Sequence, residues 1–369
     1  MADIKTHLRE LSVGIPFFTK KDYYKPNDFL EFCENFIKGT TNLTLKKLCK
    51  NPHSFDQDEL DIISRGVKLG RSIHKHIFNN QPVQTIIWAG LETQSGKAAD
   101  LIIDDKIFSL KEESFILENM GLYNYLNIIL NDKKYKRGIH CFEEFAPFEL
   151  GQWFQATKDS IISNMLNEFS FIGAKYKSSA ILLNDDLVMR FNDEEIILKN
   201  FSNYTYNGFK NDLNNKFKEK VFSKMVKKYC EGNNEYLNAK KLCAEQAGKG
   251  IENLLKNSIG TSPNVKNWFR IEDEEYYYCK VLTNNVINIL KVPSKENFNS
   301  SIIVNNIETS VPKHQLNIIT TLINTKNNAT FKFRNECRYS HGQLNGTPES
   351  KCYYIDSANK LEFAYDRII

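Results

Sequence analysis

One stretch of the chain, residues 94–117, concentrates side chains that could do hydrolytic chemistry. Asp100, Ser109 and Lys111 supply a carboxylate, a hydroxyl and an ammonium group close together in the sequence. Held on adjacent strands, such groups can bind a hard divalent cation and position a water molecule. Mg²⁺ suits so sparse a ligand set because it binds one or two carboxylates and keeps several waters.

The stretch is predicted to form a β-hairpin that leads directly into a helix. Two short apolar runs, 98–103 and 107–110, flank Asp104-Asp105, which is the pattern of two strands joined by a tight polar turn. Because side chains alternate along a strand, a turn at this pair fixes which residues share a face. The polar face then carries Asp100, Ile102, Ile107, Ser109, Lys111 and Glu113, and the core face carries Ala99, Leu101, Ile103, Phe108 and Leu110.

The spacing of these residues resembles a known motif. Asp100 followed by Ser109-Leu110-Lys111 is similar to the Asp-Xn-(Glu/Asp)-X-Lys signature of the PD-(D/E)XK nucleases, type II restriction endonucleases in particular. The small residues before Asp100 are also similar to the approach to that family's metal-binding Asp. The resemblance implies a restriction-endonuclease-like core in which Asp100 binds Mg²⁺ and Lys111 orients or activates the attacking water.

Ser109 departs from the signature, because it stands where the family has its second acid. Serine is a weaker, neutral ligand, so either a neighbouring carboxylate compensates or the site is impaired. Glu113 lies on the predicted polar face and Glu112 on the other. The family also often takes an acid from a helix before the core sheet, which here would be Glu59. The alternative is an ordinary amphipathic hairpin with a solvated polar face.

The composition is that of a globular protein, with 369 residues of which 41% are hydrophobic and 25% charged. A net charge of +4 permits nucleic-acid binding without demanding it, since a local basic surface is what matters. No apolar run is long enough to span a membrane, and the first residues lack the apolar core of a signal peptide. The scattered cysteines contain no CxxC pair, so we expect reduced thiols in a cytoplasmic protein.

The hydrophobic pattern predicts an α/β protein with a mixed central sheet flanked by helices. We expect a helical N-terminal part (1–80), a nuclease core (81–206), a lysine-rich helical segment (207–260) and a β-rich C-terminal module (264–369). The predicted elements include helices at 57–78, 115–130, 147–169, 235–259 and 312–322 and strands at 179–184, 187–191 and 195–198.

The lysine-rich segment offers a first surface for DNA. A helix predicted over 207–229 repeats apolar residues every four positions, which indicates that one face is buried. Lys220 and Lys224 belong to its many lysines, which form either a solvated face or a surface that follows phosphates without reading sequence. The apolar positions are Phe209, Leu213, Phe217, Val221 and Met225.

A polar stretch at 331–348 offers a second surface. It contains two of the chain's few arginines, and arginine suits bidentate recognition of phosphate or guanine. The alternative is a surface loop whose arginines pair with Glu336 or Glu349. The residues expected to contact DNA are Arg334, Asn335, Arg338, His341, Gln343 and Asn345.

The resulting hypothesis is a Mg²⁺-dependent endonuclease acting on double-stranded DNA, of the sequence-specific type II restriction class, with no membrane association. Alternatives are a catalytically impaired DNA-binding protein on a nuclease fold, and a soluble scaffold with no nucleic-acid role. Target sequence, homodimer formation and the choice between DNA and RNA stay open. The expected catalytic residues are Asp100, Ser109, Lys111 and Glu113, and the expected metal ligands are Asp100, Glu113, Glu112 and Glu59.

Overall fold

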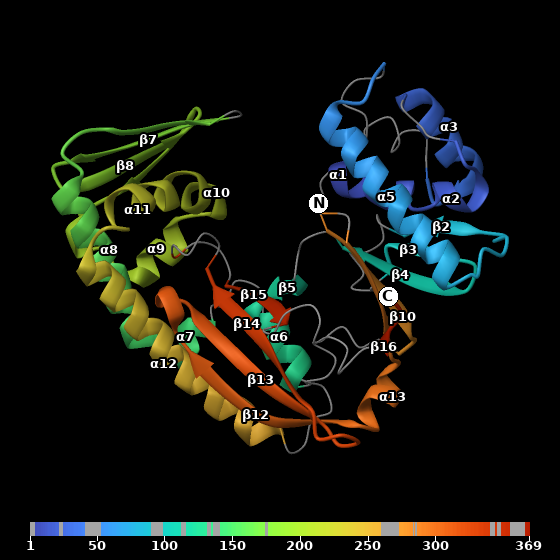
Figure 1. Ribbon diagram of the computed structural model, residues 1–369. Coiled ribbons are helices and arrows are strands. Elements are labelled where there is room, and N and C mark those ends of the chain that lie inside the picture. Colours follow the sequence, from blue (N-terminus) through green and yellow to red (C-terminus); the bar gives the residue numbers. More distant parts are fainter. Residues whose placement is uncertain are drawn as a thin grey trace.

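The structure is a computed structural model of a mixed α/β protein whose elements follow an open arc (Figure 1). One end of the arc holds the N-terminal helices and a seven-stranded sheet, and the rest holds two further sheets and a long helix. The residues described are 4–21, 25–40, 53–89, 99–111, 116–130, 134–135, 141–173, 176–259, 273–282, 284, 286–339, 344, 348–354 and 366–369.

The seven-stranded sheet is mixed, with strand order β1-β2-β3-β4-β10-β11-β16. The pairs β1–β2 and β4–β10 are parallel, and the other neighbouring pairs are antiparallel. A mixed sheet of this kind was predicted. Its strands are β1 (Ile37–Lys38), β2 (Ile86–Trp88), β3 (Leu101–Ile103), β4 (Lys106–Lys111), β10 (Tyr276–Val281), β11 (Ile287–Val292) and β16 (Asp366–Arg367).

Four helices pack with one face of this sheet in a common apolar core: α1 (Ile4–Ser12), α2 (Ile15–Phe18), α3 (Pro26–Phe36) and α5 (Gln57–His76). Helix α5 begins at a capping box, in which the Asp56 side chain accepts from the Glu59 N–H and Glu59 accepts from the Asp56 N–H. Gly66 and Gly70 let α1 and its continuation approach α5 closely: a Cβ at Gly66 would lie 2.6 Å from the Arg9 carbonyl oxygen. This helix pair supports the hairpin from behind.

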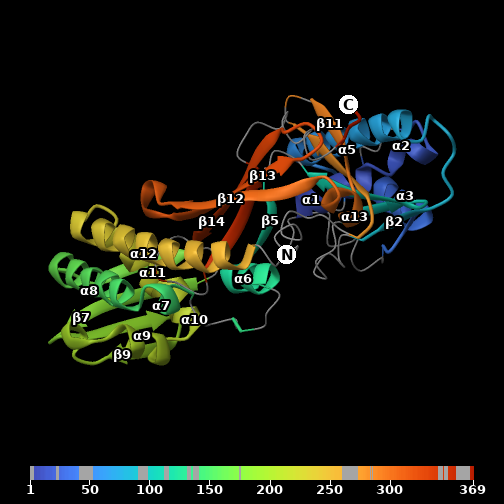
Figure 2. The same ribbon diagram turned by 90° about the horizontal axis from the view of Figure 1, so that it is seen from below.

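The five-stranded sheet is antiparallel, with order β12-β13-β14-β15-β5. Helix α12 (Asn234–Ile259) lies along it, and Glu252 of this helix accepts from the Thr309 N–H of β12 at 2.9 Å (Figure 2). The strands are β5 (Ile116–Gly121), β12 (Ile302–Ser310), β13 (Leu316–Asn324), β14 (Thr330–Arg338) and β15 (Glu349–Tyr354), accompanied by α6 (Leu122–Leu130), α7 (Cys141–Phe145) and α13 (Lys295–Asn299).

The four-stranded sheet is an antiparallel meander of consecutive strands. Its elements are β6 (Phe169–Gly173), β7 (Tyr176–Leu183), β8 (Asp186–Phe191) and β9 (Glu194–Leu198), with α8 (Pro147–Asn164), α9 (Tyr206–Asp212), α10 (Asn215–Phe217), a π-helical turn (Lys218–Phe222) and α11 (Ser223–Tyr229) packed beside it.

Most predicted elements are confirmed, and two helices are wrong. The predicted helix at 115–130 begins as strand β5 and becomes helical only at α6, because β5 pairs with β15 of a distant segment. The predicted helix at 312–322 is a short 3₁₀ turn followed by strand β13, whose β-branched residues pair with β12 and β14. In both places tertiary pairing outweighs a local helical pattern.

The sheets do not follow the four expected ranges. Residues 81–206 contribute strands to all three sheets, whereas residues 264–369 complete the seven-stranded sheet and form most of the five-stranded one. The segment 207–260 is helical as expected, although as several helices separated by a break at Leu213 and the π-helical turn.

Candidate active site

The β3–β4 hairpin has the predicted register, since Leu101 pairs with Phe108 and Ile103 with Lys106. Asp104 adopts a left-handed backbone conformation in the turn, with φ 52°. Its carboxylate accepts the backbone N–H groups of Gln84 and Thr85, both at 2.9 Å, which ties the turn to the segment leading into β2. An Asp is well suited to this position because it tolerates positive φ and satisfies nearby backbone donors.

Asp100 is held at the other end of the hairpin by its own backbone. Its N–H donates to the Phe108 carbonyl at 2.9 Å, and its carbonyl accepts from the Ala89 N–H at 3.1 Å. These two bonds join it to β4 on one side and to the end of β2 on the other. The backbone that carries the Asp100 carboxylate is therefore held in place by hydrogen bonds on both sides.

Three donors converge on one oxygen of this carboxylate. Oδ2 of Asp100 accepts the Leu110 N–H at 2.6 Å, the Ser109 hydroxyl at 3.3 Å and the Lys111 ammonium at 3.5 Å. Asp100 is only 7% exposed and Ser109 only 1%, so the polar face of the hairpin is not solvated as an ordinary amphipathic hairpin would be. Burying a carboxylate is tolerated because these donors compensate its lost hydration.

Strand β10 adds a residue that the sequence pattern did not single out. In the parallel β4–β10 pair, Tyr278 is opposite Ser109 and Lys280 is opposite Lys111, so both β10 side chains share the Asp100 face. Lys280 is 3% exposed. A lysine inside the apolar run Tyr276–Val281 is unusual and could have marked Lys280 as a candidate functional residue. The sequence does not show, however, that this strand pairs with β4. We refer to Asp100, Ser109, Lys111 and Lys280 as the Asp100 site.

The opposite face of the same strands is apolar and buried. Leu101, Phe108 and Leu110 belong to the core shared with α1 and α5, as the alternation predicted. Arg9 of α1 donates from Nη2 to the Leu110 carbonyl at 3.4 Å, so the helix contacts the strand segment that carries the site. Burial, assisted by the Asp100 charge, raises the pKa of the Cys279 thiol, which therefore stays protonated.

The described residues provide a minimal ligand set for Mg²⁺. Asp100 and Ser109 offer hard oxygens, and Mg²⁺ can bind through one or two carboxylates together with substrate phosphates and water. Within the described ranges there is no group of three or more His, Cys, Asp or Glu side chains suited to a metal. The two candidates for a second acid, Glu112 and Glu113, lie outside the described residues.

Glu59 is not part of the Asp100 site. Its Oε2 accepts from the Asp56 N–H at 2.9 Å in the capping box, and α5 packs on the face of the sheet that lies opposite Asp100. A glutamate at this position is explained by helix capping, because its side chain accepts a backbone N–H that would otherwise lack an acceptor at the start of α5.

The predicted recognition loop is partly a strand. Arg334, Asn335 and Arg338 lie on β14, with the two arginines on one face and Asn335 fully buried on the other. Arg338 lies 3.2 Å from Glu336, as the alternative reading had it, whereas the Arg334 guanidinium stacks 4.7 Å above the Tyr353 ring. Asn335 donates to the Ser350 hydroxyl at 3.3 Å, which is a role in the core. His341, Gln343 and Asn345 lie outside the described residues.

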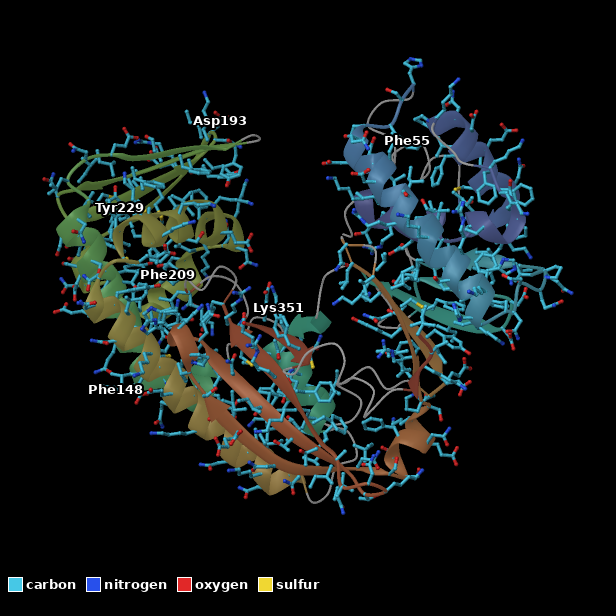
Figure 3. The ribbon with its side chains drawn as sticks, in the orientation of Figure 1. Phe55, Phe148, Asp193, Phe209, Tyr229 and Lys351 are labelled. Carbon is cyan, nitrogen blue, oxygen red and sulfur yellow. The ribbon has the colours of Figure 1, made fainter. Side chains whose placement is uncertain are left out.

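The open face of β14 and β15 lies on the inner side of the arc, where Figure 3 places Lys351. Most charges on this face pair with one another: Lys351 lies 3.4 Å from Glu349 and Lys332 lies 3.6 Å from Glu308. Among the described residues, Arg334 forms no ion pair with an acid and stacks on a ring. It is therefore the better of the two arginines for contact with a ligand.

Several lysines of 207–229, including Lys220 and Lys224, lie beside aromatic rings. The apolar positions predicted for this segment are all buried, as expected. Lys220 lies 5.2 Å from the centre of the Tyr176 ring and Lys224 lies 5.1 Å from that of Phe171. Both lysines are half-buried, so they are neither a freely solvated face nor core residues.

Comparisons with protein-family models, with curated proteins and with solved structures find no match to this chain. None of the helices in the described part of the chain has the length and apolarity needed to cross a bilayer. Within the described residues, six buried cysteines are thiols outside any disulfide bond: Cys33, Cys230, Cys243, Cys279, Cys337 and Cys352.

Proposed function

We propose that the protein is a Mg²⁺-dependent endonuclease that hydrolyses DNA phosphodiester bonds, a type II restriction-type enzyme acting in the cytoplasm. The observation that carries this proposal is the convergence of Ser109, Lys111 and the Leu110 N–H on one carboxylate oxygen of Asp100. This arrangement lies on a mixed sheet with helices behind it, which is what the resemblance to PD-(D/E)XK nucleases implies.

The residues take complementary roles in this proposal. Asp100 would hold Mg²⁺ together with Glu113 or Glu112, and the ion would polarise the phosphoryl group and acidify a bound water. Lys111 orients the attacking water and stabilises negative charge that develops on the phosphoryl oxygens. Ser109 holds the carboxylate in position through its hydroxyl. Arg334 contacts the bases of the target.

A second function is favoured by one residue. Ser109 cannot replace a carboxylate as an anionic ligand, so the same fold could bind DNA without cutting it. In that case the Asp100 site would have no catalytic role, and Asp100 would only hold its own segment to the end of β4.

Cleavage of mixed-sequence plasmid DNA separates these functions. Purified protein is incubated with supercoiled plasmid in Mg²⁺ or in EDTA, and the ends of any products are sequenced. We expect cleavage at defined sites in Mg²⁺ only, and none from an Asp100→Asn variant, which keeps the acceptor for Leu110 but loses the charge. Binding without cleavage by the wild type would favour the impaired protein. Equal cleavage by Asp100→Asn would place the active site elsewhere.

A further inference from the structure

Four lysines of the segment 215–229 each lie over a different aromatic ring of the four-stranded sheet. Lys216 is 5.1 Å from the Phe191 ring centre, and Lys228 is 5.6 Å from that of Phe169. Between them stand Lys220 over Tyr176 and Lys224 over Phe171. We call these four pairs the lysine–aromatic row.

The row is a product of helical spacing. Its lysines recur every fourth residue, so they stack along one side of the helical segment and span about 18 Å from first to last. Three of the rings beneath them form a continuous strip, because Phe191 and Tyr176 are 5.4 Å apart and Tyr176 and Phe171 are 5.9 Å apart, and Phe169 contacts Tyr229 at 6.2 Å. Tyr229, at the end of α11, marks the far end of the row in Figure 3.

Most of this positive charge is uncompensated. Lys216 pairs with Glu194, but Lys220, Lys224 and Lys228 form no ion pair with a carboxylate within the described ranges. On the inner face of the five-stranded sheet, by contrast, most lysines and arginines have acidic partners. Aromatic faces attract ammonium groups without neutralising them, so the rings fix the lysines and leave their charge available.

We propose that the lysine–aromatic row binds the sugar–phosphate backbone of nucleic acid, independently of base sequence and separately from the Asp100 site. A row of cations that recur at a regular interval along the chain is complementary to a linear polyanion with regularly spaced phosphates. The lysine ammonium groups lie over the ring faces, so we expect recognition through these groups and not through stacking of bases on the rings. Holding each lysine over a ring also reduces the side-chain entropy that binding would otherwise cost.

The salt dependence of binding tests this surface, because each phosphate contact by a lysine contributes close to one unit to the salt slope. A labelled mixed-sequence duplex is titrated in EDTA with wild type and with the triple variant Lys220→Gln, Lys224→Gln, Lys228→Gln. We expect the slope to fall by about 2.7. Between 50 and 200 mM salt, the wild type should then lose about 40-fold more affinity than the variant.

Two control variants separate the row from net charge. Lys75→Gln, Lys199→Gln and Lys326→Gln together remove the same charge from exposed sites on other elements, and should change the slope by less than one unit. Phe171→Leu with Tyr176→Leu keeps every charge, so affinity should fall a few-fold with an unchanged slope. The single variants Lys220→Gln and Lys224→Gln provide the same test if the triple variant does not fold.

Equal slopes for the triple variant and its charge-matched control would overturn the proposal. Absence of duplex binding by the wild type, or binding to vesicles rich in phosphatidylserine in its place, would also overturn it. The outcome is independent of cleavage, since the titration is done in EDTA. A protein that cuts plasmid but shows no row effect contradicts this inference alone, and a protein that shows the row effect but does not cut contradicts the nuclease alone.

Discussion

The Asp100 site and the lysine–aromatic row fix their charged groups in opposite ways. In the Asp100 site a buried carboxylate is held by its own backbone and by the Leu110 N–H, and Lys111, the next residue on β4, donates to it from across the hairpin. In the row, lysines on a helical segment rest on rings supplied by a sheet, with little acidic compensation. The first arrangement fixes one carboxylate through several hydrogen bonds, as the proposed chemistry requires, whereas the second presents positive charge, as the proposed binding of a polyanion requires.

Removing the Lys111 ammonium should give the largest difference between the two regions, because it should affect cleavage at the Asp100 site and leave DNA binding by the lysine–aromatic row unchanged. Lys111→Met keeps the aliphatic chain, so we expect cleavage to fall about 10²- to 10³-fold, the usual cost of losing one preorganised charge donor. The salt slope of DNA binding should change by no more than one unit. The control is Lys106→Met, at the turn end of the same strand, which should cleave normally. Single-turnover rates and binding titrations on one substrate measure both effects.

Lys280 tests whether the parallel partner strand contributes to the site. Lys280→Met should lower the single-turnover rate about 10- to 100-fold with little change in affinity, because the buried Lys280 amino group, opposite Lys111 in the β4–β10 pair, would act on charge that develops during reaction. Lys280→Arg should recover part of the rate. If Lys280→Met cleaved like the wild type while melting at a different temperature, Lys280 would have only a structural role.

The Asp104 turn tests whether the hairpin geometry depends on its tie to β2. Asp104→Ala removes the acceptor of two backbone N–H groups and places alanine at φ 52°, so unfolding should become easier by about 2 kcal/mol. Asp104→Asn should recover most of this loss. Asp105→Ala, one position along at an exposed side chain, should leave the urea midpoint unchanged. The salt slope of DNA binding should stay at the wild-type value in all three variants, because none of them changes the lysine–aromatic row.

The α1–α5 contact gives the smallest effect, and its control should have the opposite sign. A methyl group at Gly66 would meet the Arg9 carbonyl at 2.6 Å, so Gly66→Ala should destabilise by about 1–2 kcal/mol. Gly151 on α8 has no atom within 4 Å of the corresponding position, so Gly151→Ala should stabilise by about 0.5–1 kcal/mol. Equal shifts from both would mean that the helices do not pack as closely as described.

The hairpin could be predicted from sequence because its determinants are local. A tight turn and strict alternation fix the register, so the burial of Leu101 and Phe108 and the meeting of Asp100 with Ser109 follow from neighbouring residues alone. The buried apolar positions of 207–229 followed in the same way from a four-residue repeat.

Long-range pairing could not be predicted. Nothing local marks β10 as the neighbour of β4, so Lys280 was missed, and nothing local marks β5 as a strand rather than the start of a helix. Glu59 was assigned by analogy to a metal although its position at the third residue of a helix, after an Asp cap, is the pattern of a capping box. The sequence also could not tell that Arg338 pairs with Glu336 whereas Arg334 stacks on Tyr353.

The pairing of β4 with β10 also determines when during synthesis the Asp100 site becomes complete. The four-stranded sheet joins consecutive strands and can form as soon as they leave the ribosome, whereas β4 must wait until residue 281 before its partner exists. Until then the edge of β4 is unpaired and open to association with other chains. Closing so long a segment is slow compared with local hairpin formation. Asp100, Ser109 and Lys111 are thus translated early, whereas Lys280 joins the site only once β10 has been made. A chain interrupted before β10 would carry the hairpin with Asp100 and Lys111 but would lack Lys280 and the strand that covers the edge of β4.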